Sequence, residues 1–172
     1  DFCLSRGLGD VYKRQRLSSV SAVLATGATL SACGNSNDPV VLFNYGVASG
    51  DPLTDRVILW THATFEQSTD DVQLTYEVAT NNNFSSVVSS GIATASASNN
   101  YTVKVDATGL AAGNEYFYRF VARGGFSSSV GKTRTLPANS VTEVKLAVFS
   151  CSSYAHGYFS VYEAAASSDA QY

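Results

Sequence analysis

The cysteine at position 151 follows an apolar run of strand length, Val144–Phe149, and lies in a short turn rich in serine. A helix-forming aromatic stretch begins at Tyr158. In α/β folds, ligands and metals bind outside the carboxyl ends of strands, where a thiolate can serve as a soft metal ligand or as a nucleophile. A small buried hydrophobe at a strand end produces the same local pattern. Taken alone, the pattern favours this second role and leaves the first one open.

Two further residues near these turns are candidates for chemistry. His156 lies five residues after Cys151, at a distance in sequence that invites a Cys–His metal pair. Two ligands in one flexible turn are weak evidence, so we interpret His156 as a loop residue. Asp51, within Gly50-Asp51-Pro52, is interpreted as a turn residue because an aspartate can bond to the backbone that follows it. We therefore predict no catalytic residue within this chain.

The composition is that of a globular protein rich in strands and turns. Hydrophobic residues make up 45% of the 172 residues and charged residues 15%, with a net charge of −3. Without a basic stripe to neutralise phosphates, the sequence carries no nucleic-acid-binding signature, and we expect a monomer. The three cysteines lie far apart and form no CxxC pair. The sequence contains no methionine.

The N-terminal part is predicted to contain an export signal. Residues 1–15 match neither helical nor strand periodicity and resemble a translated sequencing remnant, although Lys13 and Arg14 would also suit the basic start of a signal peptide. Residues 16–33 form a short, weakly apolar stretch that ends in Leu-Ser-Ala-Cys-Gly, which resembles a bacterial lipobox. Cys33 would then be the lipidated residue, anchoring an exported protein to the cell envelope. An ordinary signal peptide with a cysteine at its cleavage site remains the alternative. Residues 34–42 are predicted to be a linker.

Residues 43–137 show the pattern of an all-β domain. Period-two alternation of apolar residues and polar turns between the runs predict an immunoglobulin-like or fibronectin type III β-sandwich. The alternation is carried by Leu74–Ala79, Tyr101–Asp106 and Glu115–Val121, whereas Arg56–Thr61 is a nearly continuous apolar strand.

The stretch Thr108–Tyr118 sharpens this prediction. It resembles the corner of a fibronectin type III domain, in which a leucine leads into a tight turn and a tyrosine hydroxyl bonds back to the backbone. We predict that Tyr116 is this corner residue and that Trp60 is the core indole on an early strand.

Three ordered motifs resemble the PhoD-like alkaline phosphatases. The first joins Phe43–Leu53 to Asp55–Thr61, the second is Val130–Pro137, and the third is Phe149–Tyr154, followed by Gly157-Tyr158-Phe159. Members of this family carry a small β-sandwich ahead of a calcineurin-like metallophosphoesterase domain. The resemblance implies that residues 138–172 are the truncated β-α start of that α/β domain, with a strand at Val144–Phe149.

The same resemblance implies an activity and cofactors for the parent protein. It implies a secreted hydrolase of phosphate monoesters or diesters that binds iron and calcium, with Cys151 as the only metal ligand that maps onto this chain. The other ligands, including a Gly-Asp-Tyr motif, would lie past Tyr172. We therefore expect the isolated chain to be inactive. We also expect a helix after Tyr158, with Val161, Tyr162, Ala165 and Ala166 at helical spacing, that ends near Ser167–Asp169.

Some features depart from the family, and they leave a second function open. His62 stands where an arginine is usual, and the twin-arginine export signal is not intact, so the sequence does not identify the export route to the periplasm or cell envelope. Purple acid phosphatases, which also carry a front sandwich, are a variant of the phosphatase hypothesis. The alternative from another class is an extracellular fibronectin-like module that binds carbohydrate or protein.

Overall fold

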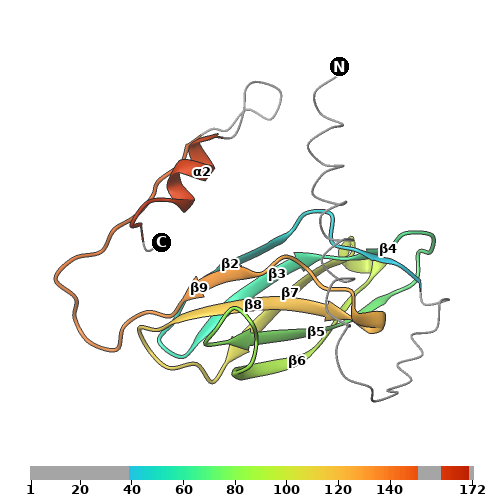
Figure 1. Ribbon diagram of the computed structural model, residues 1–172, viewed down its shortest axis with the longest axis horizontal. Helices are drawn as coiled ribbons and strands as arrows, with labels where there is room; N and C mark the ends of the chain where they lie inside the picture. The colour runs from blue at the N-terminus through green and yellow to red at the C-terminus, as the bar shows by residue number, and fades with distance from the viewer. Residues whose placement is uncertain (1–38, 151–159, 171–172) are drawn as a thin grey trace, which may run out of the picture. The chain divides into compact units, whose positions relative to one another are not determined.

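The computed structural model describes residues 39–150 and 160–170 (Figure 1). All of them belong to one of the two compact units of the chain, Asn35–Tyr172. The predicted sequence remnant, the signal peptide and most of the linker, together with Cys3, Cys33, Cys151 and His156, lie outside the described residues.

The described chain is built almost entirely from antiparallel strands. Two short 3-10 turns, Ala97–Asn99 and Arg123–Gly125, and one α-helix complete it. The strands are β1 (Val41–Leu42), β2 (Val47–Gly50), β3 (Arg56–His62), β4 (Thr64–Phe65), β5 (Val72–Ala79), β6 (Val87–Ala95), β7 (Thr102–Thr108), β8 (Glu115–Ala122) and β9 (Gly131–Arg134).

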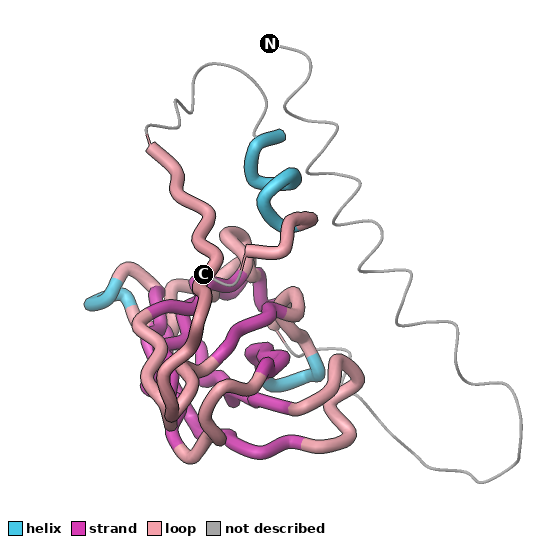
Figure 2. The backbone as a smooth tube through the Cα atoms, turned by 90° about the vertical axis from the view of Figure 1, so that its left-hand side faces the viewer, coloured by secondary structure: helices cyan, strands magenta, loops and turns pink. Residues whose placement is uncertain are grey.

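These strands form a β-sandwich, as the sequence predicted. One sheet has the order β2-β3-β7, the other has the order β6-β5-β8-β9, and β1 pairs with β4 beside them. Figure 2 shows the strands gathered into one body. Alternate residues of each sheet pack inward, because successive side chains in a strand point to opposite faces. The resulting core includes Val57, Leu59, Leu74, Val78 and Phe120, all at 0–1% exposure.

The alternation along β3 corrects one prediction. Val57, Leu59 and Thr61 are buried, so Trp60, which alternates with them, lies on the opposite, outer face and is only half-buried. The predicted role of Trp60 as the core indole is therefore wrong. The run Arg56–Thr61 is nearly all apolar, and such a run does not reveal which of its two faces is the inner one.

The predicted tyrosine corner is confirmed. The backbone N–H of Ala111 donates to the Tyr116 hydroxyl at 2.9 Å, and this hydroxyl donates to the Ala111 carbonyl at 3.3 Å. Leu110, which leads into the turn, is buried. The corner pins the connection between β7 and β8 to the body of the sandwich, because both backbone groups of Ala111 are bonded to a buried side chain.

Two tyrosine–glycine pairs hold the outer strands of the larger sheet. Tyr76 on β5 is opposite Gly91 on β6, and Tyr118 on β8 is opposite Gly131 on β9. A Cβ built on Gly131 would lie 2.3 Å from the Tyr118 ring, and one on Gly91 would lie 2.7 Å from the Tyr76 ring. Each ring thus covers the neighbouring backbone, which only glycine allows at this separation.

The C-terminal part differs in one respect from the prediction. Residues 144–149 form no strand, because no other strand of the described chain lies beside them and a strand without a neighbour has no ladder of hydrogen bonds. The predicted helix is present as α2 (Ser160–Ala166) and ends at Ser167 and Ser168, as expected. Asp51 adopts a positive φ of 46° directly after β2, which agrees with its interpretation as a turn residue.

Candidate functional site

The predicted metal ligand lies between two segments that the structure describes. Cys151 and His156 belong to residues 151–159, which follow the extended segment 138–150 and precede α2. The structure therefore gives the surroundings of this connection and not the position of the thiol. The prediction that Cys151 binds a metal ion stays a prediction.

Two contacts join the extended segment to α2. The ammonium group of Lys145 forms an ion pair with the carboxylate of Asp169, just after the helix. The rings of Phe149 and Tyr162 lie 5.1 Å apart at an interplanar angle of 48°. The segment and the helix therefore run side by side in opposite directions. Residues 151–159, with Cys151 at their start, connect the carboxyl end of the extended segment to the N-terminus of α2.

The extended segment and the helix expose apolar side chains that a folded α/β domain would bury. Leu146 is 62% exposed and Val148 is 85% exposed, and Val144, Val161 and Tyr162 are exposed as well. No residue of α2 is buried. Exposed apolar positions at strand and helix spacing mark a surface for further packing, because soluble proteins rarely leave such side chains contiguous and uncovered.

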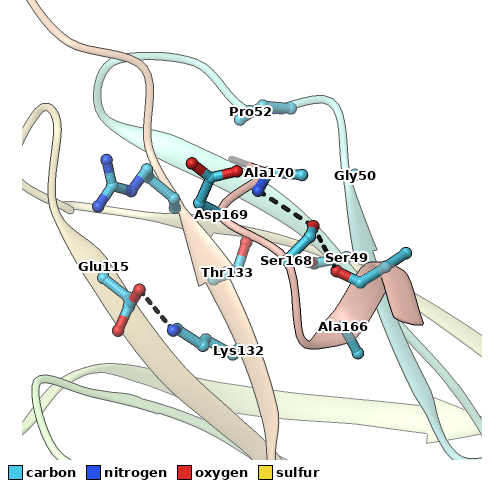
Figure 3. A pocket seen from close by; sticks show the side chains of 12 residues that line it. Ser49, Gly50, Pro52, Glu115, Lys132, Thr133, Ala166, Ser168, Asp169 and Ala170 are labelled. Atoms are coloured by element: carbon cyan, nitrogen blue, oxygen red, sulfur yellow. Dashed lines mark hydrogen bonds and ion pairs between the residues drawn. The ribbon is translucent and has the colours of Figure 1, made fainter. Parts of the chain in front are cut away.

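A cleft of about 680 Å³ lies between the end of the sandwich and the residues that follow α2. Its walls come from the end of β2, the start of β8, strand β9 and the chain just after the helix; among the residues that line it are Ser49, Gly50, Glu115, Lys132, Thr133, Arg134, Ser168 and Asp169. Figure 3 shows side chains from these elements around it. No local sequence pattern predicts this cleft, because its walls come from segments far apart in the chain.

The charges along this cleft are mostly paired. Lys132 contacts Glu115 at 2.8 Å, an ion pair drawn in Figure 3, while Asp169 is held by Lys145. Arg134 lies directly opposite Glu115 in the β8–β9 ladder. Paired charges and hydroxyls can orient a neighbouring surface, but they offer neither a nucleophile with an adjacent base nor a converging set of metal ligands.

Tyr118 on β8 links the two sheets through a hydrogen bond with Ser49 on β2, one of the residues that line the cleft. Burial raises the pKa of Tyr118 above its ordinary value of 10.0, and its hydrogen bond with Ser49 opposes part of that rise. The phenol is therefore neutral at physiological pH and acts as a structural contact between β8 and β2.

Within residues 39–150 and 160–170, no three His, Cys, Asp or Glu side chains are close enough to hold a metal ion together. In the same part of the chain, no helix has the length and apolar character needed to cross a bilayer.

Comparison with known proteins identifies the family. Residues 28–137 match the model of the family described as PhoD-like phosphatase, N-terminal domain. The chain belongs to the PhoD-like phosphatase family. This match ends at Pro137, the residue at which the sequence analysis placed the end of the sandwich.

Two individual relatives agree with this assignment. Alkaline phosphatase D of Bacillus subtilis (strain 168) is 40% identical over 129 residues, in a match that covers 70% of this chain and 22% of that protein. The solved structure of PhoD superposes with a TM-score of 0.67 at 37% sequence identity, covering 73% of this chain and 26% of that one. The chain thus spans about a quarter of the length of these relatives. The predicted family and the predicted β-sandwich are confirmed.

Proposed function

We propose that this chain is the N-terminal part of a secreted, metal-dependent phosphatase or phosphodiesterase that hydrolyses phosphate esters. The observation that carries the proposal is the 40% identity to alkaline phosphatase D, which extends over a sandwich of the same family. The antiparallel course of the extended segment and α2 supports it, because Cys151 directly follows the segment that would form a strand in the parent, and α/β domains place their sites outside the carboxyl ends of strands.

Iron and calcium are the metals that the family resemblance implies, and Cys151 is the residue that would contribute a ligand. Its thiolate is a chemically suitable donor for iron, since a thiol loses its proton when it coordinates a metal and cysteine thiolates are common iron ligands. One thiolate does not make a site, and the described residues supply no further cluster of ligands. When bound, such metals polarise phosphate oxygens and activate or position the attacking water. We propose that the remaining ligands belong to the part of the parent protein that this chain does not span.

In this proposal the described residues hold together the two segments that flank Cys151 in the chain. Two contacts hold the extended segment against the helix region. They are the ion pair between Lys145 and Asp169 and the ring contact between Phe149 and Tyr162. The exposed apolar faces of the segment and the helix would be covered by the sheet of the parent's metallophosphatase domain.

An activity assay with a chromogenic phosphate ester, with iron and calcium added, tests the proposal. We expect turnover by the full-length parent, its loss in the Cys151→Ala variant, and no turnover by this chain alone. A Ser153→Ala variant of the parent, two residues from Cys151 in sequence, is the matched control and should keep its metal content and activity. Turnover by the isolated chain that Cys151→Ala abolishes would contradict the expectation that this chain is inactive. A full-length parent that binds iron equally well without Cys151 would contradict the role of the thiol.

We further propose that Cys33 is lipidated and attaches the exported protein to the cell envelope. A diacylglyceryl group adds two acyl chains, which is what stable membrane anchoring requires. In a bacterial host, we expect radiolabelled fatty acid to be incorporated into the chain and to be absent from the Cys33→Ser variant, whereas Cys151→Ser keeps the label. Equal labelling of the Cys33→Ser variant would exclude this role.

The structure also favours one surface for the second candidate function, a module that binds carbohydrate or protein. Trp60 is half-buried on the outer face of β2-β3-β7, where Ala48 and Lys104 lie opposite it in the ladders with β2 and β7. Tyr45 packs edge-on against His62 on β3, with the ring centroids 4.8 Å apart. Aromatic rings on an outer sheet face are suited to stacking against sugar rings or apolar side chains. Quenching or a shift of the fluorescence of Trp60, the chain's single tryptophan, on titration with oligosaccharides would favour this candidate.

A further inference from the structure

Strand β6 is an edge strand that lacks the usual protection against pairing. It forms one end of the sheet β6-β5-β8-β9, and among the described residues its only ladder is with β5. No charged residue and no proline occurs from position 81 to position 100. The other edges differ: β7 carries Lys104 and Asp106, β9 carries Lys132 and Arg134, and β2 runs directly into Asp51-Pro52. Natural sheets use such residues to prevent strands from adding to an edge.

The regular part of β6 follows a bulge and has an unusual symmetry. The register with β5 shifts between Val78 and Ala79, so the strand pairs regularly from Ser89 to Ala95. Around Ile92, the residue types repeat in mirror order. Small residues flank Ile92 at positions 91 and 93, and hydroxyl residues follow at positions 90 and 94. When such a strand pairs with an antiparallel copy of itself, residues of the same type lie opposite each other.

The side chains that would meet in such a pair are already exposed. Ile92 is 71% exposed on the outer face, with Ser90 and Thr94 exposed beside it. The inner face is held by the sandwich, where the Ser89 hydroxyl donates to the Thr108 carbonyl at 2.9 Å and Tyr76 covers Gly91. Pairing along the edge therefore needs no rearrangement of the core.

We propose that β6 is a homodimer interface at which a second copy of this chain adds antiparallel, with the two-fold axis at Ile92. Ile92 then lies opposite Ile92 of the second copy, and each Ser90 lies opposite Thr94. The two four-stranded sheets become one continuous sheet. Apolar and hydroxyl cross-strand pairs of this kind stabilise antiparallel sheets, and no like charges meet at the axis. This departs from the monomer that the sequence alone leads us to expect, and it does not depend on the proposed enzymatic function.

The dimer is expected to be weak and concentration-dependent. A single pair of short strands buries less than the roughly 1,200–2,000 Å² of a standard stable interface. Its affinity would come from main-chain hydrogen bonds and the central isoleucine pair, as in other cases of strand addition.

Analytical ultracentrifugation over a hundredfold concentration range tests the interface. We expect reversible dimers of the chain that Ile92→Lys abolishes, since two lysines would face each other at the axis. Val130→Lys, a substitution of another exposed apolar residue that lies off this edge, should have no effect. The Leu146→Lys variant tests whether the chain instead associates through the exposed extended segment. If the interface is β6, this variant should still dimerise. A chain that stays monomeric throughout, or a dimer that only Leu146→Lys removes, would overturn the proposal.

Disulfide trapping tests the register in a background in which Cys3, Cys33 and Cys151 are changed to serine. The Ile92→Cys variant should oxidise to a covalent dimer, because position 92 faces itself across the axis. The Ser90→Cys variant alone should not, but a mixture of Ser90→Cys and Thr94→Cys should give a heterodimer. Efficient cross-linking of Ser90→Cys with itself would exclude the proposed register.

Discussion

The sandwich and the C-terminal segment both contain runs of apolar residues but reach opposite states. In the sandwich, the apolar residues of β3, β5 and β8 face one another across two sheets and are almost fully buried. In the described residues 144–150 and 160–166, side chains of the same types remain exposed. The difference is the presence of a partner layer, because a strand or helix is stable only when its apolar face is covered. An apolar run therefore predicts the capacity to form a strand, and its neighbours decide whether it does.

Hydrogen exchange should show the largest difference between the two regions. We expect the amides of β5 and β8 to exchange only on global unfolding, because they lie in continuous ladders inside the larger sheet. The amides of Val144–Val148 should exchange within about tenfold of the rate of an unstructured peptide, since no ladder protects them. Strong protection at Val144–Val148 in the isolated chain would show that this segment pairs with another part of the protein.

A pair of phenylalanine truncations compares the two regions energetically. Phe120→Ala removes a fully buried ring from the core and should lower the free energy of unfolding by about 3–5 kcal/mol. Phe149→Ala removes a ring that is 43% exposed, and should change the unfolding of the sandwich by less than about 0.5 kcal/mol. Chemical denaturation followed by far-UV circular dichroism measures both. Equal effects would mean that the extended segment is part of the sandwich's cooperative unit.

Two glycines of the sandwich, Gly131 against the Tyr118 ring and Gly50 in open space, differ in how much room they leave for a side chain. Gly131→Ala would place a methyl group against the Tyr118 ring, and should destabilise the domain by about 1–3 kcal/mol. Gly50→Ala is the matched control, because a Cβ there meets no atom within 4 Å and the φ angle is not in the left-handed region. A Gly131→Ala variant as stable as Gly50→Ala would show that the ring of Tyr118 moves freely, and that the close approach is not needed for packing.

The smallest effect we expect is a dependence of stability on alkaline pH. Burial raises the pKa of Tyr118 in the folded state, so its contribution is fully present below the unfolded value of 10.0 and is lost as the pH rises through the folded pKa. Tyr118→Phe should therefore flatten the decline in unfolding free energy above pH 10. Ser49→Ala removes the hydrogen bond that opposes the shift, and so it should keep the decline. An identical alkaline profile for the wild type and Tyr118→Phe would contradict this cause.

Much of the sandwich could be predicted because its signals are local. Alternation identified β5, β7 and β8, and the Leu–turn–Tyr pattern identified the corner that Tyr116 makes with Ala111. The inner face of β3 could not be predicted, because apolar residues occupy both of its faces, and Trp60 was assigned to the wrong one. Strand β6 was missed because its Ser-, Gly- and Ala-rich sequence has little alternation of its own.

The candidate site could be predicted only in part, for a related reason. The strand-like run, the cysteine turn and the helix are contiguous, so their order is visible in the sequence, and α2 lies where its spacing indicated. The cleft lined by Glu115, Lys132 and Asp169 joins three distant segments, and no local pattern reports such a meeting. Lys145 and Asp169 form their ion pair for the same non-local reason.

The sequence by itself determined the family and the two-sheet fold, because each depends on motifs and periodicities within short stretches of chain. Only the tertiary structure decided which face of β3 is buried, which strand forms an uncharged edge, and that Val144–Phe149 has no neighbouring strand among the described residues. These features depend on pairing between distant segments, and burial and strand pairing are properties of neighbours in space.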